Sequence, residues 1–276
     1  MKNAMTVDVE DYFQVSAFEP YIKKSQWDTL EHRVQNNTQH ILNVFAEYNV
    51  KATFFTLGWV AERYPELVKR IVSEGHELAS HGYEHIRVTE QTPEQFRMDV
   101  RKTKKLLEDV GGVEIKGYRA ASYSIGRDNL WALDILAEEG HKYSSSIYPV
   151  KHDLYGMPEA SRFAYQPIEG NDFKEIPIST LKMRSKNYPC GGGGFFRLYP
   201  YLISRWAFNR LNNTEQQSGI FYFHPWEIDV NQPRQENLAF KAKFRHYLNL
   251  QRMEGRIKSL LTDFEWDTMQ AIFLKP

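Results

Sequence analysis

The sequence predicts an α/β fold in which parallel strands form a barrel. Apolar runs typical of buried strands alternate with amphipathic stretches typical of helices along most of the 276 residues. We count about seven strand–helix units if residues 176–180 and 220–223 are the last strands, and this number favours a barrel over an open sheet. Four polar segments also follow predicted strands, at the strand ends where barrels place their sites.

The elements can be placed one by one from the apolar pattern and from end signals. The expected strands are residues 4–9, 52–57, 77–80, 116–119 and 142–146, and the expected helices between them are residues 38–48, 64–74, 93–109 and 128–139. Thr92 is the expected N-cap of the third helix, because Pro93 takes the first helical position and Gln95 completes a capping box. Asp128 is the expected cap of the fourth helix.

Two stretches interrupt this alternation. Residues 146–172 carry several prolines and glycines, so we expect a long ordered loop there. Residues 188–200 contain four consecutive glycines, Gly191 to Gly194, which either let the backbone approach a ligand or form a mobile lid. We assign residues 1–230 to the barrel and residues 231–276 to a short, mainly helical C-terminal extension packed on it.

Composition excludes several classes of protein. Lys and Arg total 35 and so do Asp and Glu, and this zero net charge argues against a nucleic-acid partner. Cys190 is the single cysteine, so an internal disulfide and a cysteine zinc finger are excluded. No stretch approaches the ~20 apolar residues of a transmembrane segment, and the N-terminus lacks the apolar core of a signal peptide. We therefore expect a cytoplasmic protein.

The segments Asp8-Val9-Glu10-Asp11 and His81-Gly82-Tyr83-Glu84-His85 carry residues that bind metals. His81 and His85 stand one helical turn apart, or across one tight turn, so both imidazoles can bind one cation; a surface or capping pair is the alternative. Asp8 and Glu10 point the same way if the strand continues. One carboxylate can then bind a metal while another takes a proton from water. The alternative is a solvated loop or a helix-start cluster.

The segments around Arg119 and His224 supply the remaining polar groups. Arg119 follows a predicted strand and can hold a neighbouring carboxylate ionised and oriented, although an arginine taken alone is more often part of a structural ion pair. His224 ends the strand at 220–223 among aromatic residues, which keep an imidazole suited to acid catalysis; a buried core histidine is the alternative. Together the four segments favour metal-assisted hydrolysis of an amide.

In their order and position, the four segments resemble the polysaccharide deacetylase family, also described as NodB-homology or carbohydrate esterase 4 proteins. The resemblance covers roughly residues 4–230 and is strongest to the branch with Helicobacter-type peptidoglycan deacetylase and metal-independent allantoinase. Within that branch the chain looks like the deacetylases of exopolysaccharide and exosortase loci, whose C-terminal region is similar to residues 232–247. The resemblance implies a distorted (β/α)7 barrel with the short C-terminal extension.

The resemblance also implies a metal site. His81 and His85 would be ligands of a divalent metal, with zinc first and cobalt, nickel or manganese as alternatives. The family usually has adjacent aspartates where this chain has Val9 after Asp8. The third ligand would therefore be Glu10, with Asp11 in reserve.

The catalytic roles follow from the same resemblance. Asp8 would be the general base, oriented by Arg119. The backbone N–H of Tyr123 would stabilise the oxyanion, and His224 would protonate the leaving amine.

Two positions depart from the family pattern. Ala121 stands where relatives have a proline. Ser144 stands where relatives usually have an aspartate that supports the catalytic histidine, and a serine cannot stabilise an imidazolium as a carboxylate does. Asp153 or Glu227 is expected to substitute, or the acid step is weakened.

These features predict a metal-dependent hydrolase that removes N-acetyl groups from the sugars of a surface or exported polysaccharide or its precursor. The partner is then an N-acetylated carbohydrate, and a homo-oligomer is expected because related enzymes often form one. The alternatives are a hydrolase of a small non-peptide amide, as in the allantoinase relatives, and a catalytically weak carbohydrate-binding remnant.

Overall fold

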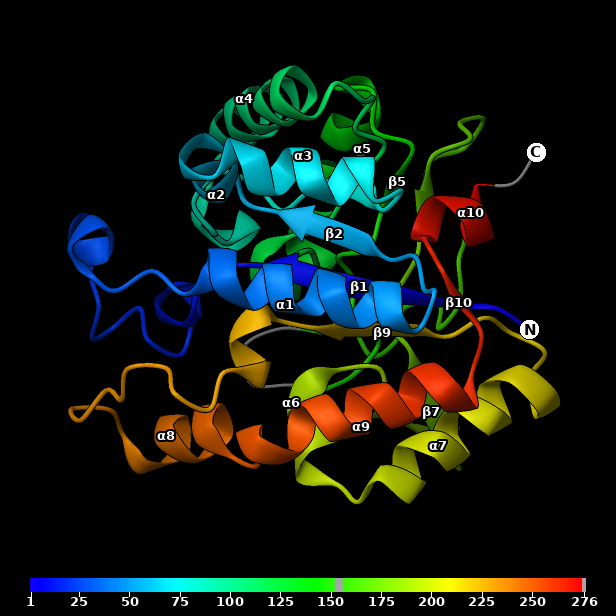
Figure 1. The fold of residues 1–276 in the computed structure, drawn as a ribbon. Coiled ribbons are helices and arrows are strands. Elements are labelled where there is room, and N and C mark those ends of the chain that lie inside the picture. Colours follow the sequence, from blue (N-terminus) through cyan, green and yellow to red (C-terminus); the bar gives the residue numbers. More distant parts are fainter. Residues whose placement is uncertain (152–155, 275–276) are drawn as a thin grey trace.

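The computed structural model describes residues 1–151 and 156–274, and its centre is a parallel sheet. The strands of this sheet run in the order β10-β1-β2-β3-β4-β5-β6, and β9 also pairs with β1. Their bounds are β1 Asn3–Val9, β2 Thr53–Thr56, β3 Glu77–Ser80, β4 Gly117–Tyr118, β5 Tyr143–Ser144, β6 Lys174–Glu175, β9 Ile220–Phe223 and β10 Trp266–Asp267. Figure 1 shows helices α2 to α5 on one side of the sheet and α6 to α9 on the other.

The sheet curves into a distorted α/β barrel, and the predicted fold class is confirmed. Adjacent residues of one strand serve two cores: Phe54 packs with the helix-facing cluster, whereas Phe55 belongs to a second cluster with Tyr222. This alternation is the period of two expected of a strand. No regular pairing joins β6 to β9 among the described residues. Hydrogen bonds from β9 span that seam: the Tyr222 N–H donates to the Gly191 carbonyl at 2.8 Å, and the Ile220 N–H donates to the Ser179 hydroxyl at 2.7 Å.

The helices agree with most of the expected positions. They are α1 Val34–Glu47, α2 Gly58–Arg63, α3 Pro65–Ser73, α4 Pro93–Gly111, α5 Trp131–Glu138, α6 Gly193–Leu198, α7 Tyr201–Asn209, α8 Phe240–Tyr247, α9 Leu250–Asp263 and α10 Met269–Phe273. The capping box of α4 is present, with Thr92 accepting from the N–H of Gln95. The helix ends where Gly112 takes a φ of 66°, in the left-handed region that favours glycine.

Three local predictions were wrong. Helix α1 begins four residues earlier than residue 38, for a reason given with Asp11 below. Asp128 caps no α-helix, because it lies in a separate 3-10 turn before α5. The strand expected at 176–180 is replaced by β6, two residues earlier, and by β7 (Thr180–Met183), which pairs with β8 (Lys186–Pro189) in a separate hairpin.

The loop expected at 146–172 is largely irregular where it is described, although residues 152–155 lie outside the described range. The C-terminal extension does more than cover the barrel. Strand β10 extends the sheet by pairing with Asn3 and Ala4 of β1, and Met253, Ile257 and Leu260 of α9 belong to the main core. The division at residue 230 stays a prediction. Within the described residues, no helix combines the length and the apolar character that crossing a bilayer requires.

Because His141 is buried, we expect the free energy of unfolding to fall as the pH becomes acidic. The ring is 2 % exposed, and burial, helped by the charge of Lys104, lowers its pKa from 6.5 to about 4. Between these two values the unfolded chain binds more protons than the folded chain, so stability rises with pH. We expect the wild type to lose about 2 kcal/mol more than a His141→Leu variant between about pH 7 and pH 5. Urea unfolding of both proteins at the two pH values measures this, and equal losses would contradict it.

Candidate active site

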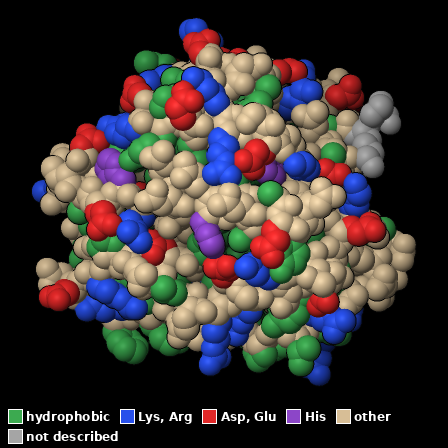
Figure 2. All heavy atoms as spheres, viewed as in Figure 1, with side chains coloured by type: hydrophobic (Ala, Val, Ile, Leu, Met, Phe, Trp, Pro, Cys, Tyr) green, Lys and Arg blue, Asp and Glu red, His purple; other side chains and the backbone are tan. Residues whose placement is uncertain are grey.

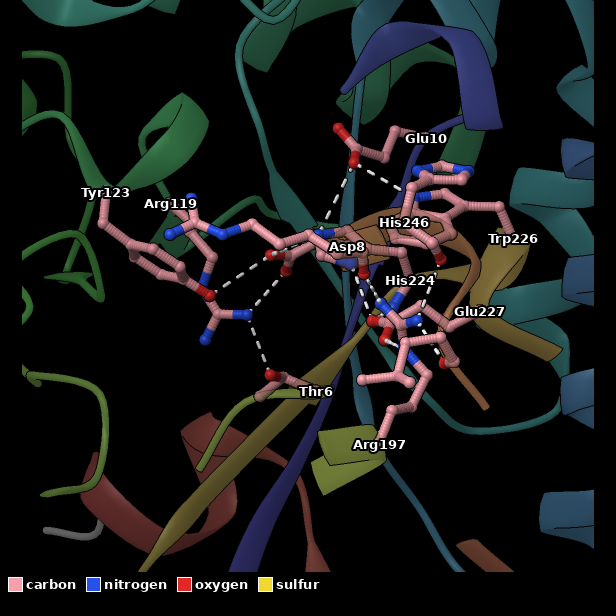
Figure 3. Close-up of polar contacts among 12 residues, drawn as sticks. Thr6, Asp8, Glu10, Arg119, Tyr123, Arg197, His224, Trp226, Glu227 and His246 are labelled. Atoms are coloured by element: carbon pink, nitrogen blue, oxygen red, sulfur yellow. Dashed lines mark hydrogen bonds and ion pairs between the residues drawn. The ribbon is translucent and has the colours of Figure 1, made fainter. Parts of the chain in front are cut away.

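The predicted site residues converge at the C-terminal ends of neighbouring parallel strands. Asp8 and Glu10 lie at the end of β1, His81 follows β3, Arg119 follows β4 and His224 follows β9. Parallel pairing places these ends at one rim of the barrel. Figure 3 shows Asp8 between Arg119 and His224, with Glu10 on the far side of His224 from Arg197.

Asp8 and Arg119 form a buried ion pair. Nη1 of Arg119 donates to Oδ1 of Asp8 at 2.6 Å and to the Thr6 hydroxyl at 2.8 Å, and the guanidinium is fully buried. The Nε of Arg119 donates to the carbonyl of Ser145, and the guanidinium carbon lies 4.0 Å from the centre of the Phe55 ring. A charge-assisted bond of this kind holds a buried carboxylate in one orientation.

Glu10, His81 and His85 form a cluster that could hold a metal. One potential ligand atom from each lies within 4.8 Å of the other two, and all three residues are buried. Nδ1 of His81 contacts the carbonyl of Arg119 at 2.8 Å, an arrangement that fixes the ring and leaves Nε2 for a metal. Nε2 of His85 lies 3.0 Å from Oε2 of Glu10.

The polarity of this cluster fits a divalent cation. Oε2 of Glu10 is buried and lacks a hydrogen bond of good geometry from any described residue. Burial raises the pKa of Glu10 and lowers the pKa values of His81 and His85, so the two imidazoles are neutral and able to ligate. Two neutral imidazoles and one carboxylate are the donor set that zinc accepts with an open position for substrate.

Asp11, the reserve ligand, does not reach this cluster. Its Oδ2 accepts from the backbone N–H groups of Arg33 at 2.7 Å and Val34 at 2.9 Å, and its Oδ1 accepts from the N–H of Tyr12 at 2.8 Å. The carboxylate therefore satisfies the free N–H groups at the start of α1, which explains the earlier start of that helix. The helix-start alternative holds for Asp11, which caps both the short 3-10 helix Tyr12–Gln14 that follows it and the distant helix α1.

Tyr123 contacts the site through its side chain. Its hydroxyl lies 3.5 Å from Oδ2 of Asp8, whereas its backbone N–H, the expected oxyanion donor, donates to the Ala120 carbonyl at 3.1 Å. Ser122 and Tyr123 both have a φ of 52°, which costs energy for residues with a side chain. The oxyanion role of the N–H stays a prediction.

His224 is held by a buried carboxylate and a buried arginine. Its Nδ1 lies 2.9 Å from Oε1 of Glu227, and Oε2 of Glu227 accepts from Nε of Arg197 at 2.7 Å. Burial alone would lower the pKa of His224, but the carboxylates of Glu10, Glu227 and Asp8 raise it. Opposing the effect of burial, Arg197 and His224 hold the pKa of Glu227 below its usual range. The three carboxylates therefore favour the charged form of the imidazole.

This arrangement bears on the missing aspartate at position 144. Ser144 lies on β5 and its hydroxyl donates to the hydroxyl of Ser146 at 2.7 Å. Of the two expected substitutes, Glu227 contacts His224 and Asp153 lies outside the described residues. Arg197 was not predicted as a site residue, because an arginine after a glycine run matches no recognisable catalytic pattern.

The C-terminal extension supplies residues to the site that the sequence did not point to. A cavity of 190 Å³ opens among the site residues, and Arg245 and His246 of α8 line it. The His246 ring stacks on Trp226 at 4.1 Å, and Trp226 stacks on His224 at 5.2 Å. Trp226 also lies within 3.4 Å of Glu10 through its indole N–H. The stack fixes the position of the His224 ring from the side opposite the barrel.

The glycine run allows Glu227 to approach His224, which leads to a prediction. A methyl group at Gly193 would lie well inside van der Waals contact with both carboxylate oxygens of Glu227, whereas one at Gly194 would meet no atom of the described residues within 4 Å. Gly193→Ala should therefore displace Glu227 and lower the rate of the amide hydrolysis that the sequence predicts by about tenfold or more. Gly194→Ala is the matched control and should keep wild-type turnover. Equal activity of the two variants would contradict the role of Glu227.

Fold and site together define an α/β-barrel protein with a candidate metal centre at the C-terminal rim of its strands. More particularly, residues 20–143 match a family model described as "Polysaccharide deacetylase". Residues 145–274 match a second model, "Domain of unknown function (DUF3473)". The first match contains His81, His85 and Arg119, whereas His224 lies in the second.

Curated relatives support the same family. A peptidoglycan-N-acetylglucosamine deacetylase of Bacillus cereus is 37% identical over 98 residues, which are 35% of this chain and 36% of that protein. The peptidoglycan deacetylase of Helicobacter pylori is 31% identical over 107 residues, which are 39% of this chain and 36% of that protein. This chain thus spans about a third of the length of each relative.

Solved structures agree on the fold. A polysaccharide deacetylase described as putative from Mycobacterium smegmatis aligns with a TM-score of 0.63 at 18% identity, over 98% of this chain and 89% of that one. PuuE allantoinase aligns with a TM-score of 0.61 at 15% identity, over 98% and 88% of the two chains. The resemblance to the branch that contains both kinds of protein is confirmed.

Proposed function

We propose that this chain is a metal-dependent hydrolase that removes N-acetyl groups from sugars of a polysaccharide or of its precursor. The observation that carries the proposal is the single small cavity onto which a candidate metal cluster, a buried Asp8 and a charged His224 all open. These are the parts that amide hydrolysis needs: activation of water, a base and an acid. The names of the relatives support acetylated sugars as the substrate class.

The metal would be held by Glu10, His81 and His85. When bound there it would polarise the acetyl carbonyl and make water more acidic. Imidazole and carboxylate donors suit zinc, with cobalt, nickel and manganese as alternatives.

The side chains of the protein perform the proton transfers. Asp8 accepts the proton of the attacking water, and Arg119 keeps this carboxylate ionised and turned toward the cavity. His224 donates a proton to the nitrogen that leaves as the free amine, while acetate forms on the carbonyl side. Glu227, which Arg197 holds as a carboxylate, favours the charged form of His224 until that step.

Acetate release tests the proposal. The purified chain is incubated with chitooligosaccharides and, separately, with allantoin, each with and without a chelator and added zinc. We expect acetate from the oligosaccharides only when metal is present. Hydrolysis of allantoin without metal would favour the small-amide alternative, and bound metal without acetate would favour a carbohydrate-binding remnant.

The cytoplasmic location and the homo-oligomer stay predictions. Cell fractionation can test the location, and light scattering can test the oligomeric state.

A further inference from the structure

Helices α6, α7 and α8 expose large hydrophobic side chains on one side of the molecule. We call these residues the apolar face: Leu198, Leu202, Ile203, Trp206, Phe240 and Phe244. Phe240 is 83% exposed and Leu202 is 69% exposed, values far above those of core residues. The spacing of Leu202 and Trp206, and of Phe240 and Phe244, places each pair on one side of its helix. Exposed hydrophobic side chains gathered in this way mark a surface for interaction.

The apolar face is also positively charged, although the whole chain has no net charge. Helices α6, α7 and α8 contain no Asp or Glu, and α8 carries Lys241, Lys243 and Arg245. Arg205 lies beside Trp206 on α7, with half of its side chain exposed, and pairs with Asp263 of α9 at 3.1 Å, so the unbalanced charge comes from α8. Figure 2 shows green hydrophobic groups interleaved with blue cationic groups along the lower edge of the molecule, where Figure 1 places α7 and α8.

This combination indicates which partner covers the apolar face. A second copy of the chain, docked through the same face, would bring like charges together and is disfavoured. A bilayer with anionic lipids offers the opposite charge to the lysines and arginines, and it accepts the Leu, Ile and Phe side chains between its headgroups. Trp206 belongs to the residue type that collects at the boundary between headgroups and acyl chains.

The catalytic cavity opens beside the apolar face. A second cavity of 410 Å³ shares Ser16, Tyr222 and Arg245 with the site cavity. Leu198 and Phe244 of the apolar face line this second cavity. A group held at the level of the lipid headgroups could therefore reach the site without leaving the surface.

We propose that the apolar face docks the protein onto an anionic lipid bilayer and holds the mouth of the catalytic cavity at the headgroups. Docking needs no substrate and no metal, so it stands or falls separately from the proposed deacetylation.

Vesicle flotation with the full chain tests the proposal. The probes are vesicles of phosphatidylcholine alone and vesicles of equal parts phosphatidylcholine and phosphatidylglycerol. The test variant combines Leu202→Ser, Trp206→Ser and Phe240→Ser, none of which lines either cavity of the site. Met98→Ser is the matched control, because Met98 is 72% exposed on α4, on the other side of the molecule. Thermal unfolding checks that all variants fold.

We expect wild type and Met98→Ser to float with the anionic vesicles, and the triple variant to bind them at least about tenfold more weakly. Lys241→Glu with Lys243→Glu should weaken binding by a similar factor, whereas Lys69→Glu on α3 should not. Acetate release from a soluble oligosaccharide should stay unchanged in the triple variant. Failure of the wild type to float, or equal flotation of the triple variant, overturns the proposal. The proposal is also overturned if the wild type does not bind vesicles but forms a dimer that the triple variant does not form.

Discussion

His81→Ala should remove the metal and lower acetate release by about a thousandfold or more, because metal activation contributes several kcal/mol to amide hydrolysis. The Nδ1 of His81 contacts the Arg119 carbonyl, so the other ring nitrogen is already positioned for a metal. Metal content by elemental analysis and acetate release by an enzymatic assay measure the two effects on the same sample.

His40→Ala is the control for this substitution. His40 is a half-exposed histidine that pairs with Glu254 on the surface, far from the cluster in sequence and absent from the cavity lining. It should keep both the metal and the activity. If His81→Ala kept full activity after losing its metal, a metal-free mechanism would replace the one proposed here.

Asp8→Asn should lower turnover by about a hundredfold to ten-thousandfold while the metal stays bound. Asparagine has nearly the shape of aspartate but cannot accept the proton of the attacking water. The metal should stay because Asp8 does not belong to the cluster of Glu10, His81 and His85. Turnover, metal content and thermal unfolding, measured together, separate the chemical loss from a structural one.

Thermal unfolding is needed because Asp8→Asn removes the charged partner of Arg119, which is fully buried. Asp229→Asn provides the matched control. Asp229 is a buried carboxylate that accepts two bonds from Arg33, and it does not line the cavity. Its substitution should lower stability without a comparable loss of turnover. A similar loss of turnover in both variants would indicate that Asp8 acts only through the fold.

Much of the site could be placed from the sequence because parallel strands impose a simple rule. Asp8, His81, Arg119 and His224 each stand at the end of an apolar run, and such ends meet at one rim of a barrel. The role of Glu227 could be given only as one of two options, because its distance to His224 depends on a turn and on the absence of a side chain at Gly193.

Asp11 shows the limit of the same rule. Three carboxylates within four residues do not show which of them faces the cavity. The start of α1 decides this for Asp11. The free N–H groups of Arg33 and Val34, brought near by the path of residues 12–33, bind Asp11 and turn it away from the metal cluster. A backbone group more than twenty positions away thus decides the direction of a side chain.

By itself, the sequence determined what depends on local pattern: the α/β class, most strand positions, the capped start of α4, and the candidate metal and catalytic residues at strand ends. These features rest on periodicity and on the chemistry of neighbouring residues. Only the tertiary structure decided what depends on contacts between distant segments. Such contacts make Glu10 rather than Asp11 a member of the metal cluster, pair Glu227 with Arg197, and stack His246 of the extension on Trp226. No local pattern encodes them, because each depends on how the chain closes around the barrel.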